Sequence, residues 1–445
     1  MDTIQFYLRG QIADAAPNFE GDFMTQRTRA LFCDLLNLPR GKFVPSEMAA
    51  GGKVGFARGV FGTTFDRDLI PVPGAGVFDG IPDMELVLED TRHPDWQQDT
   101  EIALGTLHVD GAPFGLCARG RLQATVAAWK ARGLSPKIGL EMEAYVFEQD
   151  DDGVWLPYNT PGAFVYGTGP QNDPDGLMSA LWATAADAGL RIESMNGEYD
   201  NGQFELTMAF DDALAACDAA FLFKTMAREV AADMGLLLTF LPKPIPDRGG
   251  SGLHVNFSFT DESGANVIAP DGALSDVAKG CMAGLIHHHE GLAGLLAMTV
   301  NSYDRLGPAS MAGYWANWAE DHRLVTTRSS VASPKSARLE HRMADCATNP
   351  YLAVTAVLQA ALLGVENGYE LPAAEDLDGL ENTRATRHAP SALDRALEAL
   401  DKDKALRMAV GEQICDAIIF LKQDEWKRLK DKSMDEVRDY YLPFV

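Results

Sequence analysis

Several features are scarce in this chain, and each absence excludes a class of protein. No uninterrupted apolar run approaches the roughly 20 residues that a membrane-spanning helix needs, so we expect no membrane protein. The six cysteines lie far apart and never form a Cys-x-x-Cys pair, which argues against a disulfide framework or a zinc site. The first ten residues hold no basic segment leading into an apolar stretch, so we expect no export signal and a cytoplasmic location.

Positive charge is also in short supply. The chain has 38 Lys and Arg against 64 Asp and Glu, a net charge of −26 at pH 7. Nucleic-acid binding rests on basic side chains that neutralise phosphates, so we expect no nucleic-acid partner. An anionic substrate would then be held by local arginines and divalent cations. The second half of the chain supplies such arginines: Arg305, Arg323, Arg328, Arg338 and Arg342.

The length of 445 residues exceeds what one hydrophobic core usually supports, so we expect two domains. Residues 1–111 are rich in Gly and Pro between short apolar runs, which predicts a small, mainly β domain. Residues 112–445 alternate between helical and strand patterns. The predicted helices are 121–130, 175–189, 211–234, 271–303, 350–366 and 392–426, and the predicted strands are 139–147, 202–208, 236–241 and 252–259. Residues 384–391 are expected to be a surface loop.

Four segments place acidic and polar side chains two residues apart inside apolar runs. A strand turns successive side chains to opposite faces, so Glu141 and Glu143 share one face. One such strand can be an ordinary solvated face, but four of them favour a common site. The same spacing pairs Gln203 with Glu205, His254 with Asn256 and Ser258, and Arg338 with Glu340 and Arg342.

The side chains in these segments suit divalent cations. Magnesium and manganese prefer oxygen ligands, and phosphoryl-transfer sites commonly hold two such ions. His254 alone would more often be a hydrogen-bonded core histidine. Its position after Gly249-Gly-Ser-Gly252 and beside Asn256 and Ser258 favours a ligand instead. Six residues form the candidate ligand set: Glu141, Glu143, Glu198, Glu205, His254 and Glu340.

These motifs resemble the glutamine synthetase superfamily from about Pro113 to Glu366. The matching segments are Glu141-Met-Glu-Ala-Tyr145, Glu198-Tyr-Asp-Asn-Gly-Gln-Phe-Glu205, Thr239-Phe-Leu-Pro-Lys-Pro244, Gly250-Ser-Gly-Leu-His254, Asn301-Ser-Tyr-Asp-Arg-Leu306, Arg338-Leu-Glu-His-Arg342 and Asn349-Pro-Tyr-Leu352. The resemblance implies an α+β fold. A small β-grasp domain, 1–111, would sit against a catalytic domain, 112–445, with an antiparallel sheet flanked by helices. It also implies hexameric rings stacked as a dodecamer, with active sites shared between neighbouring subunits.

The resemblance further implies roles for individual residues. One metal ion would be held by Glu143, Glu198 and Glu205, and another by Glu141, His254 and Glu340, with two or three Mg²⁺ or Mn²⁺ ions in all. Glutamate or its phosphorylated γ-carboxyl would meet Arg305, Arg323, Arg342 and Gly250. ATP would meet Arg328, Asn256 and Ser258. The ammonium-site aspartate of the N-terminal domain would be Asp66, with Asp68 as the other candidate.

In the reaction that the resemblance implies, the γ-carboxylate of L-glutamate takes the terminal phosphate of ATP, and an amine then displaces phosphate. Glutamine synthetases carry an acid for ammonium shortly after the Asn301–Leu306 motif, where this chain has Met311. Trp315 and Trp318 follow, so the wall facing the amine is expected to be apolar. These aromatics can alternatively pack the loop or a subunit contact.

The missing acid predicts a small alkylamine as the substrate, with methylamine as the best guess. A polyamine or a larger amine is an alternative, because one methylene group changes the free energy by which a pocket discriminates between two substrates by only about 1 to 3 kcal/mol. Ammonium remains another, since an acid from elsewhere can replace the missing one. A non-catalytic structural member of the superfamily is the remaining alternative. All six ligand positions carry Glu or His, which argues against it.

Overall fold

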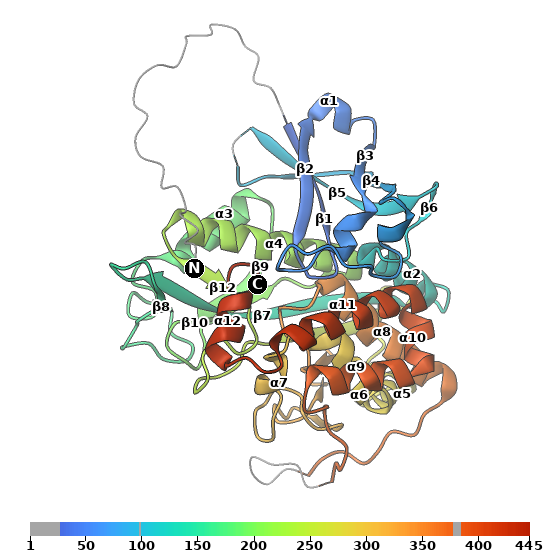
Figure 1. Ribbon diagram of the computed structural model, residues 1–445. Coiled ribbons are helices and arrows are strands. Elements are labelled where there is room, and N and C mark those ends of the chain that lie inside the picture. Colours follow the sequence, from blue (N-terminus) through green and yellow to red (C-terminus); the bar gives the residue numbers. More distant parts are fainter. Residues whose placement is uncertain (1–26, 98, 377–383) are drawn as a thin grey trace, which may run out of the picture.

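The computed structural model describes residues 27–97, 99–376 and 384–445. The first residues, on which the expectation about export rests, lie outside this range. The fold is α+β, with two sheets and helices packed around the larger one (Figure 1). Within the described ranges, no helix combines the length and apolar character needed to cross a bilayer.

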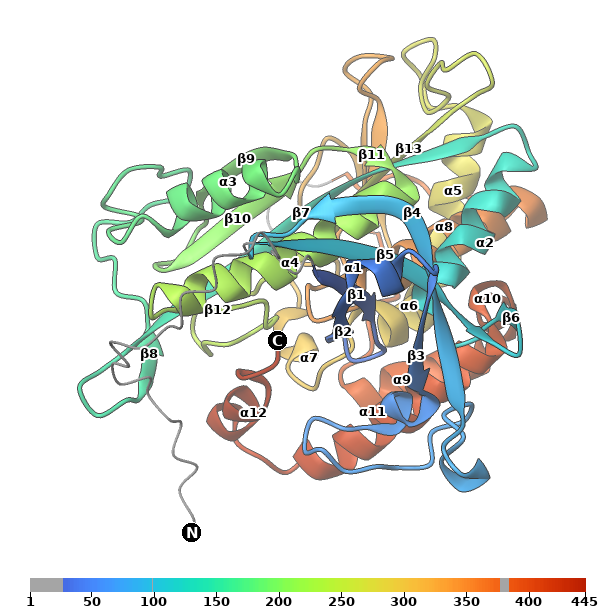
Figure 2. The same cartoon turned by 90° about the horizontal axis from the view of Figure 1, so that it is seen from above.

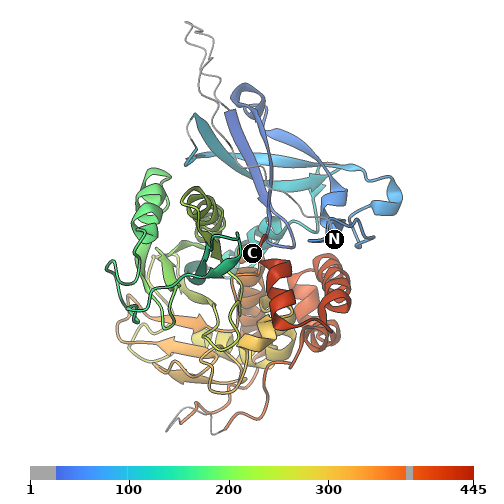
Figure 3. The same cartoon turned by 60° about the vertical axis from the view of Figure 1, so that its left-hand side comes forward.

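The smaller sheet has six strands in the order β2-β1-β5-β4-β3, with β6 pairing β5. The β1–β5 pair is parallel and the other pairs are antiparallel. The strands are β1 (Arg27–Cys33), β2 (Pro39–Pro45), β3 (Lys53–Ala57), β4 (Asp83–Pro94), β5 (Thr100–Val109) and β6 (Ala112–Pro113), with α1 (Ser46–Ala49) after β2. This sheet stands at one end of the molecule (blue in Figures 1 and 3). The domain boundary near residue 111 stays a prediction.

The larger sheet has ten strands and carries most of the residues singled out in the sequence. Its order is β14-β15-β16-β13-β7-β10-β9, and β8, β11 and β12 also pair with β7. All pairs are antiparallel except β14–β15, which is parallel. The strands are β7 (Ser135–Gln149), β8 (Trp155–Pro157), β9 (Ile192–Gly197), β10 (Gln203–Met208), β11 (Asp211–Asp212), β12 (Leu237–Thr239), β13 (Leu253–Thr260), β14 (Trp318–Glu320), β15 (Thr327–Ser330) and β16 (Arg338–His341). The four sequence segments with paired polar residues contribute to β7, β10, β13 and β16.

Apart from α12, which was not predicted, the helices lie in or near the predicted ranges, with breaks that periodicity alone does not reveal. They are α2 (Ala118–Lys130), α3 (Leu177–Asp187), α4 (Ala213–Asp233), α5 (Asp276–His287), α6 (His289–Leu296), α7 (Ser302–Arg305), α8 (Pro350–Asn367), α9 (Leu393–Lys402), α10 (Lys404–Val410), α11 (Glu412–Leu429) and α12 (Met434–Tyr441). The predicted helix 271–303 is three helices. The predicted stretch 392–426 is also three, because Asp403 caps α10 and Gly411, at φ 127°, separates α10 from α11.

Helix α8 forms the centre of the helical layer. It begins at a cap in which the Asn349 side chain accepts a hydrogen bond from the Leu352 amide, with Pro350 in the first turn, and ends at Gly368. It packs closely on α5, where a Cβ on Gly284 would lie 2.0 Å from the Ala360 carbonyl oxygen. A side chain there would force the two helices apart, so this glycine is needed for the close approach.

An ion-pair network joins the smaller sheet to the helices beside the larger one. Arg119 on α2 donates to Asp218 on α4 at 2.8 Å and to Glu89 on β4 at 2.6 and 2.8 Å. Seen from above, β1 and β5 lie over α4 (Figure 2), and Arg29 on β1 forms an ion pair with Glu229 on α4. Arg119 and Asp218 are largely buried, so removing one of them would leave a charge without its partner in a poorly solvated place. The network therefore fixes the smaller sheet against α2 and α4.

Candidate active site

The strand register gathers the acidic side chains on one face of the larger sheet. Strand β13 is antiparallel to β7 and sets His254 opposite Glu141. Strand β10 sets Glu205 opposite Glu143. Strand β16 sets Glu340 opposite Asn256 on β13. Residues that lie up to about 200 positions apart in the sequence are therefore neighbours across four adjacent strands.

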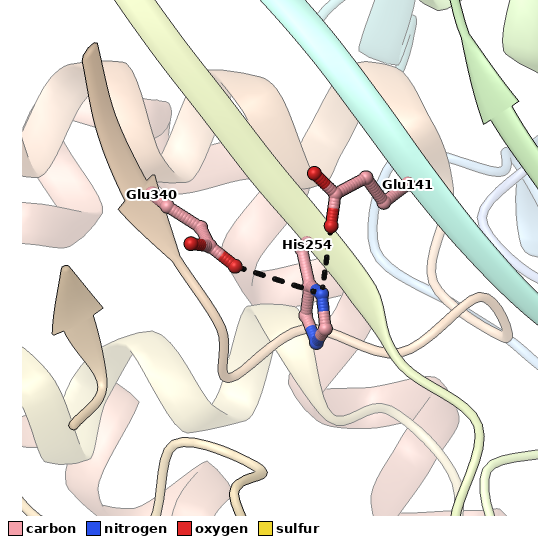
Figure 4. A group of neighbouring side chains, drawn as sticks. All are labelled: Glu141, His254 and Glu340. Atoms are coloured by element: carbon pink, nitrogen blue, oxygen red, sulfur yellow. Dashed lines mark hydrogen bonds and ion pairs between the residues drawn. The ribbon is translucent and has the colours of Figure 1, made fainter. Parts of the chain in front are cut away.

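Glu141, His254 and Glu340 converge on a point between β7, β13 and β16 (Figure 4). The His254 Nδ1 atom is 3.2 Å from a Glu141 carboxylate oxygen and 3.7 Å from a Glu340 oxygen. Among the described residues, this is the one set of three such side chains whose donor atoms all lie within 4.8 Å of one another. Two carboxylates and one imidazole at this spacing suit Mg²⁺ or Mn²⁺.

Both carboxylates of this trio are held in their charged form. Burial alone would raise the pKa of Glu141, but the hydrogen bonds and charge of His254, together with Asn256, bring it to about 2. Burial also acts to raise the pKa of Glu340, and the charges of Arg342 and His254 lower it below its usual value. The site is therefore anionic before any cation binds, as a metal site must be.

A second cluster, formed by Glu143, Glu198 and Glu205, lacks this compensation. Burial, followed by the charges of Glu143 and Glu205, raises the pKa of Glu198 to about 7. Burial and the charges of Glu141 and Glu143 raise the pKa of Glu205. Carboxylates that repel one another in a half-buried place are stabilised by a divalent cation, so their chemistry fits a metal ion. Their donor atoms converge less tightly than those of the first trio.

Arg305 lies across the glycine-rich turn before β13. Its guanidinium donates to the Met343 carbonyl at 2.8 Å and to the Arg342 carbonyl at 3.1 Å. A Cβ on Gly250 would lie 2.6 Å from the Arg305 Cγ atom, and one on Gly252 would lie 2.5 Å from a guanidinium nitrogen. The glycines therefore make room for this arginine, and the structure places Gly250 directly against it.

Two further arginines pair with Glu340. Arg342 forms an ion pair with one Glu340 oxygen, and Arg328 donates to the other at 3.1 Å. Arg323 differs, because it is exposed and makes no recorded hydrogen bond or ion pair with another described residue. Its charge lowers the pKa values of Glu198 and Glu205, which places it in electrostatic range of the second cluster. Its donors are therefore available to an anionic substrate.

Asn256 and Ser258 line a pocket of about 230 Å³ on the same sheet. Asn256 donates to Glu141 at 2.9 Å and accepts from Arg338 at 3.0 Å, so the pocket opens beside the first trio. Lys335 and Phe210 also line it and were missed in the sequence. Both carried a signal, since Lys335 stands three residues before Arg338 and Phe210 follows the predicted strand 202–208.

The segment 307–318, which we call the flap, lies beside Arg342. The Arg342 Nε atom donates to the Met311 carbonyl at 3.2 Å, and the Met311 side chain is 50% exposed. Gly313, at φ 80°, packs so tightly that a Cβ would lie 2.7 Å from the Met343 amide nitrogen. Trp318 donates its indole N–H to the Pro372 carbonyl at 2.7 Å, and Trp315 is packed against Tyr314. Met311 thus lies beside Arg342, whereas Trp318 is engaged with a loop.

Asp66 is not brought to the other site residues within one chain. It is exposed, accepts from Arg428 at 3.1 Å and from the Tyr440 hydroxyl at 3.0 Å, and so lies against α11 and α12. The alternative, Asp68, also accepts from Arg428, at 2.6 Å. Neither makes a recorded contact with the carboxylates of the larger sheet.

Comparison with known proteins identifies relatives for most of this chain. Residues 115–441 match the model of the glutamine synthetase catalytic domain. A glutamine synthetase from Halobacterium salinarum is 32% identical over 342 residues, 75% of each chain. The γ-glutamylethanolamide synthetase GlnA4 from Streptomyces coelicolor is 32% identical over 334 residues, 73% of this chain and 71% of its own. A glutamate–isopropylamine ligase from a Pseudomonas species is 31% identical over 300 residues, 65% of each chain.

Two solved structures extend the similarity to nearly the whole chain. The structure described as apo GmaS without ligand has a TM-score of 0.80 and 27% identity, and the match covers 93% of this chain and 96% of that one. The structure described as a GmaS/ADP complex has a TM-score of 0.79 and 26% identity, with 94% and 97% covered.

Proposed function

This chain belongs to the glutamine synthetase family of ATP-dependent carbon–nitrogen ligases, and on that premise we propose that it joins the γ-carboxylate of L-glutamate to a small alkylamine, methylamine being the best candidate. The product would be a γ-glutamylamide, with ADP and phosphate released. Relatives named for ethanolamine and isopropylamine support an amine larger than ammonium.

The position of Met311 is the observation that carries the proposal. Its carbonyl is bonded to Arg342, so the residue stands at the edge of the site where the resemblance expects an acid for ammonium. The flap, residues 307–318, contains no Asp or Glu at all. An apolar side chain there cannot accept the fourth N–H of ammonium, whereas the carbon of an alkylammonium loses little by lying against it.

The two clusters of ligands support two divalent cations in this proposal. Glu141, His254 and Glu340 would hold one ion, and the three remaining glutamates would hold the other. Such ions neutralise and bridge a phosphate during its transfer. The pocket beside Asn256 and Ser258 opens next to the first trio, which supports nucleotide binding there with its phosphates toward the carboxylate cluster and Arg328.

Three arginines would stabilise the negative charge that the metal ions do not neutralise. Arg323 is exposed and makes no hydrogen bond or ion pair within the described part of the chain, and Arg305 and Arg342 border the turn where glutamate would lie. All three can therefore stabilise charge on the γ-carboxylate and on the phosphate that leaves it. The γ-carboxylate takes the terminal phosphoryl group of ATP and ADP is released. The alkylammonium loses one proton, its nitrogen attacks the acyl carbon, the C–O bond to phosphate breaks, and the nitrogen loses a second proton. No covalent bond to the protein is needed.

We propose further that active sites are completed between subunits of stacked hexameric rings. Asp66 contacts α11 and α12 in its own chain, so a role in deprotonating the amine requires a neighbouring subunit. We also propose a cytoplasmic location, which is supported by six free and buried cysteines, since reduced thiols are typical of that compartment.

Phosphate release with glutamate, ATP and Mg²⁺ tests the proposal. We expect methylamine to support a much higher kcat/KM than ammonium across a panel that also includes ethylamine, ethanolamine, isopropylamine and putrescine. A preference for ammonium would contradict it. Failure to release phosphate with any amine, together with no ATP or Mn²⁺ binding in calorimetry, would instead favour a non-catalytic protein.

A further inference from the structure

A short segment that lies about 70 residues after the flap in the sequence pairs with flap residues 314–316. Residues 384–389, which we call the brace, were expected to be a surface loop. The Ala389 amide donates to the Tyr314 carbonyl at 2.7 Å, and the Ala316 amide donates to the Arg387 carbonyl at 3.0 Å. Trp315 and His388 form an antiparallel bridge between these two bonds. The brace therefore runs beside the flap as a short strand-like partner.

Three aromatic rings close the contact between brace and flap. The His388 ring stacks on the Tyr314 ring, with centroids 4.9 Å apart and planes 13° apart. The same His388 ring meets Trp315 edge-on at 5.7 Å, and Tyr314 meets Trp315 edge-on at 4.8 Å. Such ring pairs contribute beyond the area they bury and prefer defined geometries, so His388 restricts where Tyr314 and Trp315 can lie.

Helix α6 anchors both partners from behind. The buried His289 places its Nε2 atom 2.9 Å from the Tyr314 carbonyl, and burial lowers the pKa of His289 to about 4. The imidazole is thus neutral at ordinary pH and donates to that carbonyl. Arg387 pairs with Glu290 and donates to the His287 carbonyl at 3.0 Å. The brace and the flap are therefore fastened to the same rigid element.

The part of the flap that precedes Tyr314 contacts Arg342. Only two residues separate Tyr314 from Met311, whose carbonyl accepts from Arg342. Gly313, between them, rests on the Arg342–Met343 backbone without room for a Cβ. Because Gly313 has no free space around it, a shift of Tyr314 would displace either Met311 or the backbone of Arg342.

We propose that His388 is a positioning residue that sets the shape of the amine wall by stacking on Tyr314, so that the brace takes part in selecting the amine. This inference rests on the proposed function, since it assigns the flap to the amine. Among the described residues, His388 contacts Tyr314, Trp315 and Ala389 and none of the six candidate metal ligands. It acts through Tyr314 and the flap.

The test compares two histidine–tyrosine stacks in the same region. His388→Ala removes the stack on Tyr314, and His388→Phe keeps a ring there. His287→Ala is the matched control, because it removes a stack on Tyr369, at 4.0 Å and 12°, that does not touch the flap. For each variant, KM is measured for the amine that the wild type uses best, for glutamate and for ATP, along with the ranking of amines.

We expect His388→Ala to raise the amine KM roughly three- to tenfold and to reduce the differences in kcat/KM among the amines. The KM values for glutamate and ATP should stay within about twofold of the wild type. His388→Phe should restore the amine KM, and His287→Ala should leave it unchanged. The proposal is overturned if His388→Ala leaves the amine KM at the wild-type value or raises all three KM values together. It is also overturned if His388→Phe does not restore the amine KM.

A melting curve accompanies each variant. If His388→Ala does not fold, His388→Gln, which keeps bulk without a ring, is judged by the same criteria. A wild type that prefers ammonium would refute the alkylamine function. The same KM comparison, run with ammonium, would still decide the role of His388.

Discussion

The face of the larger sheet and the flap beside it differ in almost every physical respect. The sheet face carries five Glu or His side chains whose positions are dictated by strand register, and Glu198 lies in the turn between β9 and β10. The flap carries no acid and is held by ring contacts and a few backbone hydrogen bonds to the brace. The sheet face is therefore suited to the phosphoryl chemistry common to the family, and we propose that the flap governs the choice of amine.

This difference shows where specificity can change without loss of catalysis. Moving any ligand on the sheet disturbs a set of charges that compensate one another, as Glu340 does with Arg342 and Arg328. Replacing a flap side chain such as Met311, which is half exposed, disturbs few neighbours. Substitutions in the two regions should accordingly have effects of different kind as well as of different size.

The largest effect is expected from Glu340→Gln. This change removes a proposed metal ligand and leaves Arg342 and Arg328 without their anionic partner, so turnover should fall at least about 100-fold. The loss should be equal for every amine, because the proposal assigns the choice of amine to the flap and not to the sheet. Phosphate release and circular dichroism measure it, and Glu262→Gln, at an exposed position, is the control. A near-normal rate would refute the role assigned to Glu340.

A smaller effect, on selectivity and not on rate, is expected from Met311→Glu. A carboxylate at this place can accept an N–H of ammonium and penalises an apolar carbon, so the ratio of kcat/KM for ammonium to that for methylamine should rise about 10- to 100-fold. Met408→Glu, which adds the same charge at a remote and 71% exposed methionine, is the matched control. An unchanged ratio would separate Met311 from the amine site.

The smallest effect concerns stability of the metal-free protein. Burial and two neighbouring glutamates raise the pKa of Glu198 to about 7, above the value of about 4.3 expected when unfolded. The folded state thus binds the extra proton between these pH values, and the stability of the wild type falls as pH rises through this window. Glu198→Gln removes the penalty. It should stabilise the metal-free protein by about 1 kcal/mol at pH 8 and by little at pH 5, since partial exposure reduces the full effect.

Urea unfolding in EDTA at the two pH values measures this difference, and Glu141→Gln provides the opposite case. The pKa of Glu141 is held at about 2, so its charge stabilises the fold above about pH 4.3, and that contribution is lost only as pH falls toward 2. Glu141→Gln should therefore destabilise the protein at both pH values. If both variants changed the free energy of unfolding in the same direction, the two carboxylate clusters would not differ as described.

The sequence predicted the sheet face better than anything else in the molecule. Alternation of polar and apolar residues is a local signal, and it placed Glu141 and Glu143 on one strand and His254 and Asn256 on another, as the structure has them. The position of Asn256 opposite Glu340 depends on which strands pair, which single-strand periodicity does not contain. The repetition of the pattern on four segments favoured a common site, and the family resemblance supported it, but neither signal gave the pairing of the strands.

The breaks in the helices and the pairing of the brace could not be predicted in this way. The predicted helix 271–303 contains neither Gly-Pro punctuation nor a cap signal at His288, where the backbone leaves helical geometry between α5 and α6, so one long helix was expected. The contacts of Tyr314 with His388 and with His289 join segments that are 74 and 25 residues away. A loop with no periodicity gives no sign of such a partner. Asp66 likewise matched by resemblance but contacts α11 and α12.

A competition between amines in one vessel tests the central claim most directly. Equal concentrations of methylamine and ammonium are supplied with glutamate, ATP and Mg²⁺, and the two products are quantified by mass spectrometry. The account predicts γ-glutamylmethylamide in large excess over glutamine. A product mixture dominated by glutamine would contradict it and would mean that an acid outside the flap completes an ammonium site.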